Sequence, residues 1–273
     1  MSAPAGAMAR PVHLPDVRLS TVEFDACWEL LGLGNTPLTL DLPSPGRTWR
    51  ERRKVLSSVL AALRGRGLAD RSAPGNMVAG PLRLLARPDY QLDLRLDRRG
   101  GQDSRAGAMT AIAAAAGGYG VLLAQHRDEI RLRPVRPAQL VPSVVGLAGP
   151  MTAAAGRVVN MPAEVFDAAR EATTDGKLWT MADQLVARGI PRLDAAAWVR
   201  MCTGIVSVGR LGSAFWTDGV PRFGPWVIGF HGTEAGHFLQ LRRPGPGGET
   251  VTVCPLDAPG LARLAGELLA EGA

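Results

Sequence analysis

Within residues 20–32, 48–67 and 82–87, apolar residues recur every three or four positions, which is the spacing of helices that bury one face, and residues 35–47 form an extended, proline-rich segment between them. Two capping boxes, Ser20–Glu23 and Thr48–Glu51, mark the starts of two such helices. Gly32 and Gly67 are placed to end them. The pattern therefore predicts a helical opening to the chain.

After residue 88 the apolar period changes to two. Apolar and polar residues alternate over 90–97, 119–126 and 129–133, which predicts half-buried strands. Residues 106–116 are rich in alanine and favour helix by intrinsic propensity. We nevertheless predict a strand there, because four successive strands close an antiparallel meander that a lone helix would interrupt. Prolines bracket the start of a helix over about 138–148.

The second half of the chain follows the same plan. Pro162 suits the first position of a helix with Asn160 or Met161 as its cap, and Asp194 suits the cap of a helix near 194–203. The other predicted elements are a helix near 178–188, strands near 204–216, 225–231, 236–243 and 250–254, and a helix over about 258–270.

Each half thus consists of helices, then four strands, then one helix. The joints also match, since Pro134 stands six residues before Leu140 and Pro255 stands six residues before Leu261. This suspected internal repeat predicts a pseudo-two-fold architecture, with two sheets that are joined or face each other.

We predict an α+β fold in which two quasi-symmetric halves, residues 17–150 and 151–273, form one domain. Residues 1–16 have no apolar core of a secretory signal, so we expect a disordered tail and a cytoplasmic protein. The three cysteines stand far apart, which favours reduced thiols. No apolar run approaches the length of a membrane span, so we expect no membrane insertion.

The net charge of +6 is concentrated in residues 1–150, which carry 20 basic and 13 acidic residues. Aromatic residues make up only 5% of the chain, which leaves few platforms for base stacking, so we expect no nucleic-acid partner. The basic run Arg47–Lys54 is interpreted as a solvated helix face. A second polar segment, Asp97–Arg105, is predicted to form a loop between two strands.

The segment His231–His237 holds two histidines and a glutamate. A metal site or an acid–base pair is one interpretation, but the spacing matches no zinc signature and glycines interrupt the segment. We therefore favour a hairpin turn with solvent-facing polar residues, and we predict no cofactor. A small-ligand or metal-dependent enzyme that uses this turn stays as an alternative function.

Met181, Leu185, Trp198 and Met201 recur at helical spacing on two predicted helices. Methionine suits surfaces that adapt to a partner, so these residues either line an exposed groove or form ordinary core. The spacing leaves both interpretations open. If they line a groove, Met201→Asp should abolish partner binding and leave the fold intact.

Four stretches resemble the EspG family, the cytosolic chaperones of actinobacterial ESX (type VII) secretion systems. The resemblance implies two α+β halves, no catalysis, and binding of the apolar tip of a helical client, which is either a PE–PPE heterodimer or a WXG100-like hairpin. The four stretches are Leu19–Arg53, Arg83–Leu96, Arg131–Leu147 and Glu249–Leu269.

The same resemblance implies where the client binds. The family uses its carboxy-terminal helices and the loop between two early strands, which correspond here to residues 178–203 and to Asp97–Arg105. A scaffold protein that self-associates is a further alternative function, and the sequence leaves open whether the chain forms a homodimer. The client-binding residues expected on this basis are Arg98, Arg99, Asp103, Arg105, Met181, Leu185, Trp198 and Met201.

Overall fold

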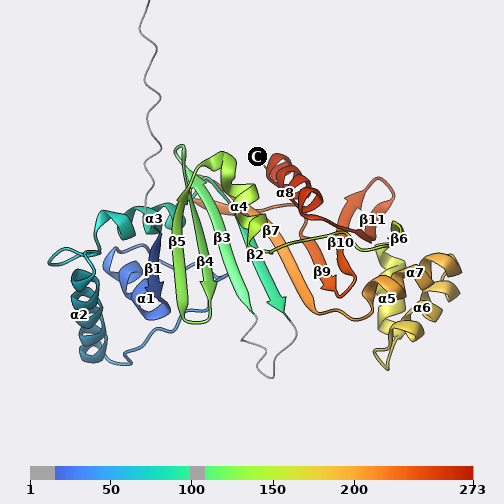
Figure 1. The fold of residues 1–273 in the computed structure, drawn as a ribbon, viewed down its shortest axis with the longest axis horizontal. Coiled ribbons are helices and arrows are strands. Elements are labelled where there is room, and N and C mark those ends of the chain that lie inside the picture. The colour runs from blue at the N-terminus through green and yellow to red at the C-terminus, as the bar shows by residue number, and fades with distance from the viewer. Residues whose placement is uncertain (1–15, 99–107, 273) are drawn as a thin grey trace, which may run out of the picture.

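A computed structural model describes residues 16–98 and 108–272 (Figure 1). In these residues an eleven-stranded sheet has the order β1-β5-β4-β3-β2-β7-β9-β10-β11-β6, with β8 paired to β7. The strands are β1 (Val17–Ser20), β2 (Tyr90–Arg98), β3 (Met109–Ala116), β4 (Tyr119–His126), β5 (Glu129–Val135), β6 (Val159–Pro162), β7 (Ser207–Thr217), β8 (Val220–Phe223), β9 (Ile228–Thr233), β10 (Gly236–Gly245) and β11 (Gly248–Pro255).

Helices lie at both ends of this sheet and over its centre (Figure 1). Both predicted capping boxes are present, and each serine or threonine accepts from the backbone of the glutamate three residues later. The helices are α1 (Thr21–Leu30), α2 (Trp49–Gly65), α3 (Asn76–Ala86), a 3₁₀ turn (Pro137–Gln139), α4 (Leu140–Gly146), α5 (Ala163–Ala172), α6 (Leu178–Ala187), α7 (Arg192–Cys202) and α8 (Ala258–Gly272).

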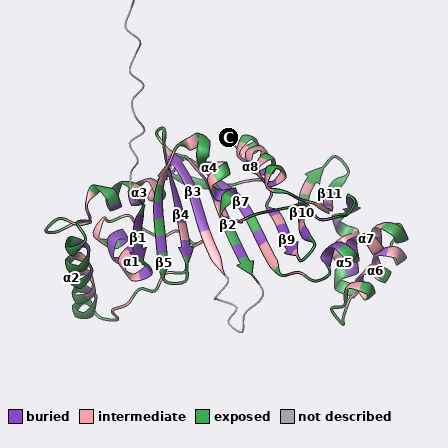
Figure 2. Ribbon diagram, viewed as in Figure 1, coloured by how far each residue is buried: buried purple, intermediate pink, exposed green. Residues whose placement is uncertain are grey.

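The helices divide between the two faces of the sheet. On one face, α4 and α8 share a core with β2, β3, β7 and β9. On the other face, α1–α3 cover the amino-terminal end and α5–α7 cover the carboxy-terminal end, each with a separate core. Strands β3 and β4 are mostly buried (Figure 2), and the two halves meet where β2 pairs with β7.

The predicted α+β fold and the strand at 106–116 are confirmed. Strand β3 runs between β2 and β4 and is buried on both faces, with Ala111 and Ala113 toward α4 and with Ile112 and Ala114 toward α1–α3. Its small side chains fit between two helical layers, so tertiary packing overrides the helix propensity of alanine.

The structure corrects the number of strands. Each half carries a short strand that was not predicted, β1 or β6, and a further hairpin strand, β8, follows β7. The two short strands are equivalent, because each lies beside the last strand of its own meander and each leads directly into a ten-residue helix. The pairings run from Val17↔Leu132 to Ser20↔Glu129 in one half, and from Val159↔Val253 to Pro162↔Thr250 in the other.

Two predicted helix starts were wrong. Asn160 and Met161 belong to β6, so Pro162 is the N-cap of α5 and is not its first residue. Helix α7 begins at Arg192 after Pro191, which places Asp194 in the first turn, where it pairs with Arg157. A proline fixes φ near the value that a helix start needs, so it takes the position predicted for the polar caps.

Candidate partner-binding surface

The four apolar residues predicted on the carboxy-terminal helices lie in the core. Met181, Leu185, Trp198 and Met201 are 5%, 0%, 6% and 2% exposed, and all belong to the cluster that joins α5–α7 to the sheet. The structure therefore corrects the idea that they line an exposed groove. They hold the three helices together and determine which side chains those helices present outward.

The loop residues are only partly described. Arg98 is exposed at the end of β2, directly opposite Ser207 at the start of β7. Arg99, Asp103 and Arg105 lie outside the described residues. Residues 203–206 join α7 to β7, so the end of α7 lies close to Arg98, the last residue of β2, which pairs with Ser207.

The His231–His237 segment is a hairpin turn, as predicted, but His231 does not face solvent. Its side chain is 1% exposed, its Nε2 lies 2.7 Å from the carbonyl oxygen of Met201, and its ring stacks on Phe238. Burial lowers the pKa of His231. Within residues 16–98 and 108–272 there is no cluster of side chains suited to a metal ion.

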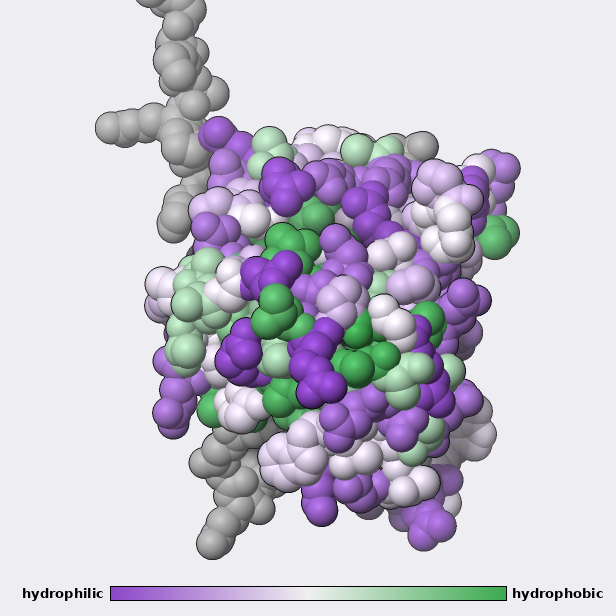
Figure 3. All heavy atoms as spheres, turned by 90° about the vertical axis from the view of Figure 1, so that its right-hand side faces the viewer, coloured by the Kyte–Doolittle hydropathy of each residue, from purple (hydrophilic) through white to green (hydrophobic). Residues whose placement is uncertain are grey.

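The outer surface of α6 and α7 carries large apolar side chains. Trp179 is 65% exposed and Leu193 is 74% exposed, and Val206 is 40% exposed where α7 leads into β7. Figure 3 looks at this end of the molecule and shows apolar side chains among polar ones. Trp179 stands two positions from Met181, so it faces away from the buried stripe; the helical spacing alone could have indicated this.

A strip that carries four charged side chains crosses the middle of the sheet, on the face that also carries α1–α3 and α5–α7. Leu94 and Leu211 point to the α4 and α8 core, so their neighbours along each strand point the other way. We call these neighbours the central strip: Asp93, Arg95 and Asp97 of β2, and Val208, Arg210 and Gly212 of β7.

The central strip carries two arginines and two aspartates, and the two arginines face each other. Arg95 and Arg210 are exposed and stand directly opposite each other, a cross-strand arrangement that is destabilising for like charges. Asp93 accepts hydrogen bonds from Thr39 and Gln91, at 3.0 and 2.8 Å, and burial raises its pKa. A cavity of about 410 Å³ lies over the strip, and its rim carries the exposed side chains of Leu38 and Phe223.

The arrangement suits binding to another protein. It combines an open cavity, two facing arginines and exposed apolar side chains. The model of the EspG family matches residues 20–267. The chain belongs to the EspG family. That membership confirms the resemblance found in the four sequence stretches.

Solved structures extend the comparison for this EspG-family chain. The Mycobacterium tuberculosis type VII secretion system chaperone EspG5, in complex with a PE25–PPE41 dimer, matches with a TM-score of 0.75 at 16% identity, over 95% of this chain and 97% of that one. At this identity the likeness establishes a shared fold. HtdX of the same organism matches over 88% of this chain and 100% of that one at 15% identity, but its TM-score of 0.13 supports no argument.

No curated protein matches the chain. In the part of the chain that the structure describes, none of the helices has the length and apolar character needed to cross a membrane.

Proposed function

We propose that the chain is a cytoplasmic chaperone of a type VII secretion system, which binds the apolar tip of a helical client and catalyses no reaction. The client class is a PE–PPE heterodimer or a WXG100-like hairpin. The observation that carries the proposal is membership of the EspG family over residues 20–267, together with the fold shared with EspG5. EspG5 itself is described as a chaperone in complex with a PE25–PPE41 dimer.

We further propose that the client contacts the central strip and the outer surface of α6 and α7. Exposed Trp179 and Leu193 supply apolar area, and each Å² removed from water contributes roughly 25 cal/mol before the cost of association is subtracted. Arg95 and Arg210 stand directly opposite each other, so acidic groups of the client would relieve their repulsion. Arg98 lies at the edge of this surface, beside the 99–107 segment.

The test is co-purification of the tagged chain with a co-expressed PE–PPE pair or WXG100-like protein encoded beside it. We expect Trp179→Asp/Leu193→Asp and Arg95→Glu/Arg210→Glu each to lower client recovery by about tenfold or more, because a few anchors dominate such interfaces. Trp49→Asp is the matched control, since Trp49 is 82% exposed on α2 at the opposite end of the molecule.

The two parts of the proposal, the client-binding surface and the chaperone function, can fail independently in this experiment. Full client recovery by both double variants would remove this surface from the proposal. Failure of the unsubstituted chain to recover any of these helical clients would contradict the chaperone function itself.

A further inference from the structure

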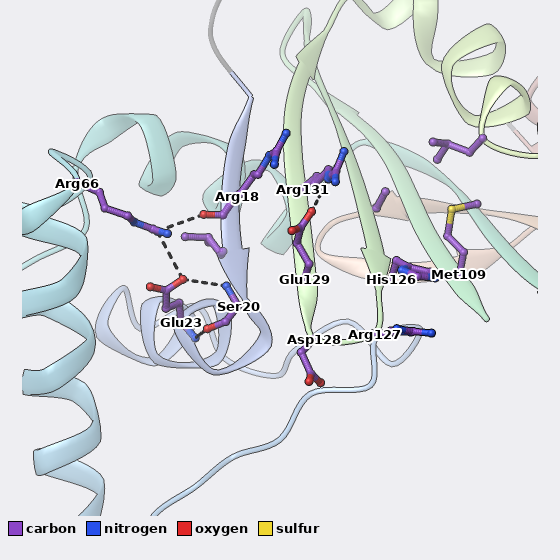
Figure 4. A pocket seen from close by; sticks show the side chains of 13 residues that line it. Arg18, Ser20, Glu23, Arg66, Met109, His126, Arg127, Asp128, Glu129 and Arg131 are labelled. Carbon is purple, nitrogen blue, oxygen red and sulfur yellow. Dashed lines mark hydrogen bonds and ion pairs between the residues drawn. The ribbon is translucent and has the colours of Figure 1, made fainter. Parts of the chain in front are cut away.

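A second open cavity lies on the opposite face of the sheet, at its amino-terminal end. Its volume is about 770 Å³, and residues of β1, β3, β4 and β5 line it (Figure 4). Val17 and Leu19 of β1 pack against α1–α3, so Arg18 points to the other face, where α4 lies further along the sheet. This cavity is therefore separate from the central strip.

Arginines surround the cavity, as Figure 4 shows for Arg18, Arg66, Arg127 and Arg131. Two of them are paired: Arg131 lies 2.5 Å from Glu129, and Arg66 lies 3.4 Å from Glu23. Among the described residues, the guanidinium groups of Arg18 and Arg127 have no ion-pair partner. Asp128 also lines the cavity, but the arginines still outnumber the carboxylates.

The internal repeat shows that the fold does not require this charge. Arg18 stands directly opposite Arg131, two like charges in cross-strand contact. The same register in the other half holds Asn160 opposite Thr252, a neutral pair joined by a 2.7 Å hydrogen bond. The arginine pair is thus a feature of one half alone.

The turn beside the cavity also carries an arginine in the amino-terminal half and none in the carboxy-terminal half. Arg127, between β4 and β5, has φ of 53°, a left-handed conformation that costs a side-chain-bearing residue of order 1 kcal/mol. The equivalent turn between β10 and β11 contains Pro246 and Gly247 and begins and ends with glycines. A strained arginine lines the cavity where glycine would be relaxed.

The floor of the cavity is apolar. Met109, Ala124 and Leu147 are half-buried there, between β3, β4 and the end of α4. A free phosphate would contact the arginines and leave this apolar floor uncovered. An acidic peptide with apolar side chains would satisfy both the arginine rim and the floor.

We propose that this cavity binds an acidic peptide segment of a second partner protein, through Arg18, Arg127 and Arg131 at the rim and Met109, Ala124 and Leu147 at the floor. Arginine pairs with carboxylates through two parallel hydrogen bonds, which gives such a site direction as well as charge. The proposal goes beyond the proposed function, since this site lies on the other face from the client surface.

The experiment measures fluorescence anisotropy of the labelled peptide EDLELDE with the full chain. We expect binding that weakens with salt, and an equally charged peptide, EDSESDE, should bind at least about fivefold more weakly because it leaves the floor uncovered. Arg18→Asn/Arg131→Thr copies the neutral pair of the other half and should lower affinity by about tenfold or more. Arg50→Asn/Arg53→Thr, at exposed positions of α2, is the charge-matched control and should change affinity less than about twofold.

Arg127→Gly is a second variant, in which weaker peptide binding could not be explained by a less stable fold. It should raise the melting temperature, because glycine relaxes the turn, and still weaken peptide binding. Undiminished binding by Arg18→Asn/Arg131→Thr and Arg127→Gly would overturn the proposal. So would equal binding of the two peptides, or complete displacement by inorganic phosphate, because either would indicate a free-anion site. Arg18→Asn/Arg131→Thr should still recover the helical client, and loss of the client would overturn the independence of the two sites.

Discussion

At the scale of single residues, His231 joins the helical end to the sheet. Its Nε2 meets the carbonyl oxygen of Met201 on α7, and its ring stacks on Phe238 of β10. Its Nδ1 is buried without a hydrogen-bond partner among the described residues. The fold therefore accommodates the neutral ring, since a second ring proton would have no acceptor.

This contact predicts a pH dependence. Above the ordinary histidine pKa of 6.5 the ring is neutral in both the folded and unfolded chain, so it has no effect on the slope of stability with pH. Below 6.5 the unfolded chain takes up the proton first, because burial lowers the folded pKa, and the free energy of unfolding falls. Urea titrations between pH 7 and 5 measure how steeply the free energy of unfolding falls with pH. In His231→Gln this slope should be smaller than in the unsubstituted chain, by up to about 1.4 kcal/mol per pH unit.

His237→Gln is the control for the loss of a histidine in the same turn. His237→Gln changes the histidine at the other end of the same turn. An identical slope for the unsubstituted chain and His231→Gln would show that His231 does not set the acid sensitivity.

Arg52 illustrates what a local pattern misses. It belongs to the basic run interpreted as a solvated helix face, yet its side chain is only 10% exposed and forms ion pairs with Asp25 at 2.7 Å and Glu29 at 2.5 Å. The partners stand on α1, and helical spacing along α2 carries no information about them. Burial of a charge needs such partners, which only the packing of the two helices provides.

At the scale of elements, α5–α7 form a unit with a buried seam and an exposed apolar outer face. The spacing of Met181, Leu185, Trp198 and Met201 is the same for a core seam and for a groove, so the sequence could not distinguish them. Once Met181 and Leu185 are buried, Trp179 must lie on the opposite side of α6 and be exposed, because a helix at the surface buries only one side.

Met201→Asp now has a different expected outcome. The side chain is 2% exposed, so the substitution buries a carboxylate without a partner and should lower the free energy of unfolding by about 3 kcal/mol or more. Thermal unfolding followed by circular dichroism measures the effect, with Trp179→Asp as the exposed control on the same unit. Equal melting temperatures for the two variants would contradict the assignment of Met201 to the core.

At the scale of the whole molecule, two copies of one plan are joined edge to edge through β2 and β7. The matching of Pro134 with Pro255 indicated the repeat, and the equal registers of β1 with β5 and β6 with β11 agree with it. The short strands themselves, VRLS and VNMP, present only two buried positions each and pair with strands about a hundred residues away. No local period reveals pairing of that kind. The central strip escaped prediction for the same reason, because it exists only once Arg95 faces Arg210.

The two halves have diverged in what they expose. The carboxy-terminal half presents apolar side chains on α6 and α7, and the amino-terminal half presents an arginine pair at a register where its counterpart is neutral. The two halves share one arrangement of strands and helices but expose different side chains, as expected if each half binds a different partner. The division of the chain at about residue 150 stays a proposal about its domain organisation.

The central claim is that this EspG-family chain holds a helical client in a defined complex. The most direct measurement is the mass of the complex by light scattering after size-exclusion chromatography, with the chain and its neighbouring client pair co-expressed. The account predicts one stable species that contains one copy of the chain and one client heterodimer. A client pair that stays soluble and elutes apart from the chain would contradict it.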